Sequence, residues 1–130
     1  MSSGGEDSDG AGHGLALRVS AVVGLLGVLL GAFGAHGLEA RLEANGTMGA
    51  WETAVFYQLV HAVVLWVLAM HGRGGSPAWW CFFAGVVSFS GGIYLVALKL
   101  ASWAWPLAPV GGVLLMVGWG ILILAGRRTG

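Results

Sequence analysis

The sequence predicts an all-α integral membrane protein in which four transmembrane helices form one bundle. The 130 residues are 57% hydrophobic and only 9% charged, and the mean hydropathy is +0.82. A soluble domain normally carries about 25% charged residues, so a fold surrounded by water is excluded. Four apolar stretches are each long enough to cross roughly 30 Å of hydrocarbon as a helix. None of them alternates with the period of two that a membrane β-barrel requires.

The chain divides into a polar tail at residues 1–14 and one four-helix transmembrane domain at residues 15–130. The tail is acidic and rich in Gly and Ser, and it begins with MSSGGEDSDGAGH. Such a segment buries too little apolar surface to offset the entropy of ordering, so the tail is predicted to be disordered.

The first span is predicted over residues 15–35, and the connection after it holds a short amphipathic segment. Leu38 and Leu42 lie one helical turn apart in this connection. They predict a short helix that lies in the membrane interface and ends at Asn45-Gly46.

The remaining spans are predicted over residues 53–70, 78–98 and 107–125. Pro77 and Pro106 precede the last two, at a position where the missing N–H costs a helix nothing. Most tryptophans fall near span ends, where an amphipathic ring is favoured at head-group depth. These are Trp51, Trp79, Trp80, Trp103 and Trp105.

The orientation of the spans follows from Lys and Arg near their ends. One face carries four of these cations and the other carries only Arg41 and Lys99. Since cytoplasmic loops are enriched in Lys and Arg, both termini are predicted to lie in the cytoplasm. The four cations on that face are Arg18, Arg73, Arg127 and Arg128.

Small residues at helical spacing predict how the spans pack, because helices in lipid associate through close contact and not through a hydrophobic gain. The first and third spans each carry such a stripe. Two interpretations stay open, namely packing within one chain and GxxxG-type dimerisation between chains. The candidate packing residues are Gly24, Gly27, Gly31, Gly34, Ser88 and Gly92.

A candidate polar site lies near the bilayer midplane. Tyr57, Gln58 and His61 share one face of the second span, and Ser90 and Tyr94 reach a comparable depth on the third. A histidine at this depth needs a partner inside the bundle. It is either a core residue bonded to Ser90 or to a backbone carbonyl, or a functional group such as a proton relay, a quinone contact or a metal or haem ligand.

A second polar cluster is predicted at the outer boundary of the bundle. His36 ends the first span, Glu52 begins the second and Lys99 ends the third. These residues form either an interfacial ion pair or the site of an enzyme that acts on lipid. Since paired carboxylates and a nucleophile with its base are absent from the sequence, no catalytic residue is assigned.

Four motifs, taken in order, resemble those of the YgdD-like family of small four-span membrane proteins, a domain of unknown function. Residues 31–38 read GAFGAHGL, and residues 51–62 carry W-x-T-A-x-x-Y-x-x-x-H-A. Residues 89–94 read FSGGIY, with Gly92 where the family more often has Ser. Residues 109–119 carry P-x-G-G followed by Gly-Trp.

The resemblance covers about residues 15–126 and leaves the acidic tail outside. It implies a multi-pass protein of the bacterial inner membrane without an established activity, related to small animal mitochondrial transmembrane proteins. The family motifs are centred on His36 and His61. Because Gly92 removes a possible hydroxyl, Ser90 is the expected third-span partner.

The predicted function is that of a non-enzymatic bundle that acts as a homo-oligomer or as an accessory subunit of a membrane complex, in contact with membrane lipids. No cofactor, metal or nucleic-acid partner is expected, since His and Cys lack ligand spacing and the six basic residues are balanced by six acidic ones. The alternative is a lipid-, quinone- or haem-binding or proton-conducting site centred on His61.

Overall fold

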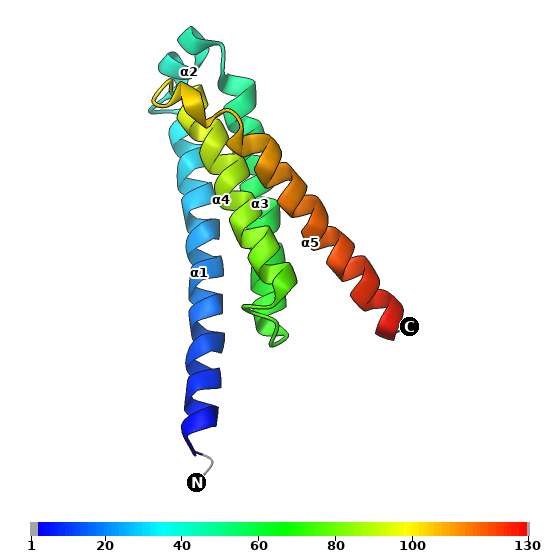
Figure 1. Ribbon diagram of the computed structural model, residues 1–130. Helices are drawn as coiled ribbons and strands as arrows, with labels where there is room; N and C mark the ends of the chain where they lie inside the picture. Colours follow the sequence, from blue (N-terminus) through cyan, green and yellow to red (C-terminus); the bar gives the residue numbers. More distant parts are fainter. Residues whose placement is uncertain (1–2, 130) are drawn as a thin grey trace.

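The computed structural model describes residues 3–129, and within this range the chain is helical without strands (Figure 1). In chain order the elements are α1 (Ser3–Ala35), α2 (Glu39–Asn45), α3 (Met48–Met70), α4 (Pro77–Ala97), the short 3-10 turn η1 (Ser102–Ala104) and α5 (Leu107–Thr129).

Four helical segments are long and apolar enough to cross a membrane. They are Gly10–Ala35, Met48–Met70, Pro77–Ala97 and Ser102–Arg127. Three of them contain a predicted span, and Pro77–Ala97 ends one residue before the predicted end of the third span, so the all-helical membrane class is confirmed. Pro77 occupies the first turn of α4, and the Ser76 side chain accepts a hydrogen bond from the Trp79 backbone N–H, which caps that helix.

The N-terminal region differs from its sequence-based description. The structure continues α1 back to Ser3, whereas residues 1–14 are predicted to be a disordered tail; residues 1–2 of that tail lie outside the described range. The first transmembrane span is a helix that is already nucleated, and such a helix gains one hydrogen bond for each residue added. The span therefore favours extension of α1 into the tail.

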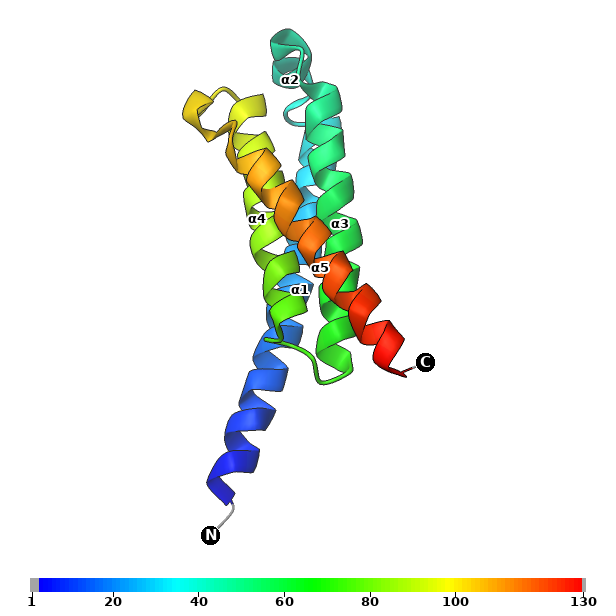
Figure 2. The same cartoon turned by 45° about the vertical axis from the view of Figure 1, so that its right-hand side comes forward.

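The four long helices form an open array. α1 packs against α3, and α4 packs against both α3 and α5. Figure 1 shows α1 and α5 on opposite sides of the central pair, with α5 diverging toward the C-terminus. Figure 2, turned by 45°, shows α5 crossing in front of the other helices at an angle. The sequence predicts one four-helix bundle but not which helices are neighbours, and the structure sets α1 and α5 apart.

The glycine stripe of α1 packs within the chain, against α3. A Cβ added at Gly27 would come 2.7 Å from Leu59 Cδ2, and one at Gly31 would come 3.2 Å from Val55 Cγ1. A Cβ at Gly34 would overlap the Trp51 indole. The structure therefore uses this stripe for intramolecular packing, the first of the two interpretations above.

Glycines also set the contact between α4 and α5, and here the backbones themselves approach. A Cβ on Gly111 would overlap the Phe89 backbone N and lie 2.6 Å from the Gly85 carbonyl oxygen. A Cβ on Gly92 would come 2.9 Å from Leu107 Cβ. Glycine at these positions lets two helices cross at backbone contact distance.

We expect Gly111→Ala to destabilise the protein by about 1–3 kcal/mol, because the added methyl group meets backbone atoms of α4 that cannot rotate away. The matched control is Gly120→Ala on the same helix, where a Cβ meets nothing within 4 Å. The control should leave stability unchanged or raise it slightly. Reversible unfolding in mixed micelles measures both variants, and equal stabilities would contradict the packing of α5 on α4.

Candidate functional site

Helix α3 carries polar side chains that contact each of the other three long helices. Most of them are almost fully buried, with Gln58 5% and His61 4% exposed. Because lipid offers no water to satisfy such groups, each must find a partner in the protein. The partners that they find define the candidate site.

The Gln58 amide lies at the centre of this polar core and joins three helices. Its Nε2 donates to the Val23 carbonyl oxygen of α1 at 2.9 Å. Its Oε1 accepts a hydrogen bond from the Tyr94 hydroxyl of α4 at 2.6 Å. One side chain of α3 therefore ties α1 to α4.

Trp51 repeats the contact with α1 seven residues earlier on α3. Its Nε1 donates to the Leu30 carbonyl oxygen at 2.9 Å. Its ring also packs against the Tyr94 ring, with centroids 4.6 Å apart. The ring is 2% exposed, so it is part of the protein core near the start of α3.

The two carbonyl oxygens on α1 are accessible because of glycines. Gly27 follows Val23 by four residues, and Gly34 follows Leu30 by four. Each carbonyl therefore accepts the helical hydrogen bond from the N–H of its glycine. A side chain on the glycine would collide with the α3 residues beside it, Leu59 in one case and Trp51 in the other. The stripe therefore exposes two acceptors to donors from α3.

Ser90 of α4 makes a separate bond to α3. Its hydroxyl donates to the Ala54 carbonyl oxygen at 2.7 Å, and the side chain is 2% exposed. One interpretation expects a bond between Ser90 and His61, but the Ser90 hydroxyl bonds Ala54 instead. It fixes α4 on α3 one turn away from Gln58.

His61 is bonded through both of its ring nitrogens. Its Nδ1 lies 2.8 Å from the Tyr57 carbonyl oxygen, and since a carbonyl can only accept, Nδ1 is the protonated nitrogen. Its Nε2 accepts from the Trp119 indole N–H of α5 at 3.2 Å. The core-histidine interpretation with a backbone carbonyl partner describes this geometry. Neither nitrogen has a free lone pair for a metal or haem iron.

Aromatic rings surround His61. The Phe82 and Trp119 centroids lie 5.7 and 6.1 Å from that of His61, and the Tyr57 ring stacks at 6.0 Å. Tyr57 is 39% exposed, so the three residues predicted to share a face differ in burial. Trp119 is absent from the sequence-based candidates, although the Gly-Trp of the fourth motif includes it.

The outer cluster of His36, Glu52 and Lys99 does not form. All three side chains are exposed, and no hydrogen bond or ion pair joins them in the described residues. Helix α2 accounts for this difference, because it covers this end of the molecule. Its Leu42 is fully buried with Trp51 and Ala97, so the apolar side of α2 packs on protein.

Residues from α2 and the turn after it instead cap the C-terminal end of α4. Arg41 Nη2 donates to the Leu98 carbonyl oxygen at 2.7 Å. Asn45 Nδ2 and Thr47 Oγ1 donate to that of Ala97 at 3.1 and 2.8 Å. Terminal carbonyls lack a helical donor, so these bonds satisfy groups that would otherwise be unpaired. As the sequence predicts, α2 ends at Asn45-Gly46, where Gly46 caps the helix with a φ of 69°.

The arrangement defines a polytopic helical membrane protein with a saturated polar core. Among the described residues no group of three or more His, Cys, Asp or Glu side chains could hold a metal ion. The buried polar groups named above are engaged in bonds between or within helices. These hydrogen bonds hold the helices in place relative to one another within the lipid.

Comparison with known proteins identifies the family. A family model described as a protein of unknown function, DUF423, matches residues 30–112. The chain belongs to this family, whose curated relatives are called UPF0382 membrane proteins. No solved structure matches the chain.

The relatives come from bacteria and from a fungus. SERP0230 of Staphylococcus epidermidis is 37% identical over 84% of this chain and 95% of its own length. YwdK of Bacillus subtilis is 37% identical over 82% and 91%. C1782.12c of Schizosaccharomyces pombe is 33% identical over 82% and 97%. The similarity extends over nearly the whole length of these small membrane proteins.

We expect Gln58→Met to lower stability by about 1–2 kcal/mol, because it removes two interhelical hydrogen bonds and leaves the Tyr94 hydroxyl without its acceptor. Tyr94→Phe should cost about half as much. The double variant should cost less than the sum of the two single variants, since the shared bond is lost only once. Unfolding free energies in micelles give the three values, and strictly additive costs would show that the two side chains are not bonded.

Proposed function

We propose that this membrane protein is not an enzyme and acts by association in the bilayer, as a homo-oligomer or as an accessory subunit of a larger membrane complex. The polar core supports this proposal, because its side chains are engaged in holding the helices together. The site that remains for function is then an outer surface of the array.

The observation that carries the proposal is a small-residue face on α4 that is partly exposed in the structure. Ala84, Ser88 and Gly91 follow one another at spacings of four and three, and all three are partly exposed. A Cβ added at Gly91 meets nothing within 4 Å. The Ser88 hydroxyl makes no hydrogen bond within residues 3–129.

Such a face suits helix association in lipid. Small residues let two backbones approach closely, and a hydroxyl that faces lipid gains a bonding partner when a second helix covers it. The other glycines of α4 differ, because Gly85 and Gly92 already contact α5 and η1. Ser88, predicted as a packing residue, lies on this partly exposed face.

We expect Gly91→Leu to abolish or strongly weaken association, because the larger side chain holds the backbones apart. Gly120→Leu on α5 is the matched control, since it makes the same change where a Cβ also meets nothing within 4 Å. Single-molecule photobleaching in liposomes counts the subunits in each particle. A wild-type protein that is monomeric and copurifies with no other protein would contradict the proposal, as would equal effects of the two variants.

The proposal places both termini in the cytoplasm of a bacterium, with the protein in the inner membrane. Figure 1 shows both termini and the α3–α4 connection at the same end of the array. This end carries Arg18, Arg73 and Arg127, and the other end carries Arg41 and Lys99. The excess of cations supports a cytoplasmic location for it. We also propose that the protein is related to the YgdD-like proteins and to small animal mitochondrial transmembrane proteins.

A fusion of green fluorescent protein to the C-terminus should therefore fluoresce in bacterial cells, and a C-terminal alkaline phosphatase fusion should be inactive. Placing the same two reporters in the connection between α1 and α3 should reverse the pattern. The reverse result at the C-terminus would contradict the predicted orientation.

A further inference from the structure

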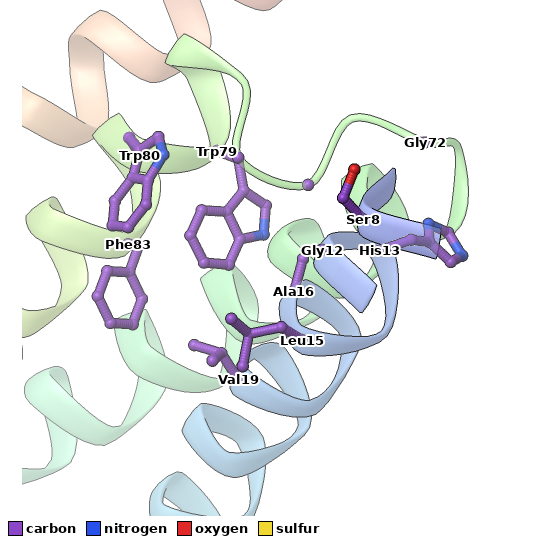
Figure 3. Close-up of a pocket in the computed structure, with 12 residues that line it drawn as sticks. Ser8, Gly12, His13, Leu15, Ala16, Val19, Gly72, Trp79, Trp80 and Phe83 are labelled. Atoms are coloured by element: carbon purple, nitrogen blue, oxygen red, sulfur yellow. The ribbon is translucent and has the colours of Figure 1, made fainter. Parts of the chain in front are cut away.

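A cavity of about 620 Å³ lies between the N-terminal half of α1, the α3–α4 connection and the first turns of α4 (Figure 3). It lies apart from the polar core around Gln58 and His61. Its volume falls within the range of about 300–1,000 Å³ that is typical of small-molecule sites.

Trp79 provides the one buried polar side-chain atom of the described residues that has no partner. The residue is 3% exposed, and its indole Nε1–H makes no hydrogen bond. Figure 3 shows the nitrogen on the edge of the ring that faces α1, on the side away from Trp80. A buried donor without an acceptor costs free energy, so an acceptor in this cavity would be stabilised.

The other walls indicate an elongated apolar ligand. Leu15 and Val19 of α1 line one side, and Phe83 of α4 lines the other. Leu15 and Trp80 are more than half exposed on the outer surface of the helices, so the cavity opens toward the lipid. An acyl chain can enter between α1 and α4 from this side.

Charge and depth indicate the polar part of the ligand. Arg73 lies in the α3–α4 connection between two glycines that line the cavity, and Arg18 lies one turn from Leu15 on α1; both are exposed. Cations at the end of a span attract the head groups of anionic lipids. The same end carries Trp80, whose amphipathic ring is favoured at that depth.

We propose that this cavity binds one anionic phospholipid, with an ester or phosphate oxygen accepting the Trp79 Nε1–H bond and the start of an acyl chain lying along Leu15, Val19 and Phe83. The site holds the lipid between α1 and α4, which otherwise pack against α3. This assignment does not depend on self-association of the protein.

Native mass spectrometry of the delipidated full-length protein, titrated with dioleoyl phosphatidylglycerol, tests the site. We expect one tightly bound lipid in the wild type. Trp79→Phe should weaken its affinity about tenfold, which corresponds to about 1.4 kcal/mol for the lost hydrogen bond. Trp103→Phe is the matched control and should bind the lipid like the wild type, because Trp103 is 72% exposed and does not line the cavity.

A second pair of variants tests the cavity itself and does not disturb the core. Gly12→Phe adds a ring to the cavity wall, whereas Gly10→Phe adds the same ring where it does not line the cavity. A Cβ meets nothing within 4 Å at either position, so both variants should fold, as thermal melting checks. Gly12→Phe should abolish binding and Gly10→Phe should not.

Three results would overturn the assignment. Lipid binding by Gly12→Phe at wild-type affinity would show that the lipid lies elsewhere. Equal lipid affinities of Trp79→Phe and the wild type would show that the lipid does not accept a hydrogen bond from Trp79. Tight binding of a quinone, without binding of phosphatidylglycerol, would show that the cavity accepts an apolar ligand of a different class.

Discussion

The hydrogen bonds of the Gln58 side chain depend on a constraint that the bilayer imposes on the whole fold. In hydrocarbon there is no water to accept or donate a bond, and helices gain nothing by hiding apolar surface from one another. A buried amide must therefore be satisfied by its neighbours. Gln58 draws on a backbone carbonyl of α1 and a hydroxyl of α4, while His61 receives the indole N–H of α5. These bonds join the three other long helices to α3.

The glycines and the polar side chains act together. Gly27 and Gly34 follow the carbonyls of Val23 and Leu30 by one helical turn, and the lack of a side chain at each leaves room for the donors of α3. On α4 and α5, Gly85 and Gly111 allow backbone contact, so this pair of helices is held by close packing. The result is an open array in which Gln58, His61 and Ser90 are buried between helices, while large apolar side chains are exposed on the outer faces. Function in such a molecule is then sought at its surface and at the cavity beside Trp79.

Much of the fold could be predicted from the sequence, because span length and the lack of charge are local properties. The α1 stripe and the burial of Gln58, His61 and Ser90 also follow from helical periodicity. Which partner each side chain finds could not be predicted, since that depends on the angle between helices. His61 bonds Trp119 and Ser90 bonds Ala54, pairings that depth alone does not distinguish. The expected meeting of His36, Glu52 and Lys99 fails because α2 covers that end and caps α4 through Arg41.

The central claim is that Gln58 bonds the Val23 carbonyl across the interface of α1 and α3. Gln58 is the only glutamine in the sequence, so side-chain ¹⁵N labelling of glutamine reports on this residue alone. Solid-state NMR in lipid bilayers can measure the dipolar coupling between this nitrogen and ¹³C-labelled valine carbonyls. We predict a coupling between the Gln58 side-chain nitrogen and the Val23 carbonyl carbon, whose oxygen lies 2.9 Å from that nitrogen. In Val23→Leu the coupling should disappear, because residue 23 then carries no labelled valine carbonyl. An absent coupling, or one unchanged in Val23→Leu, would contradict the claim.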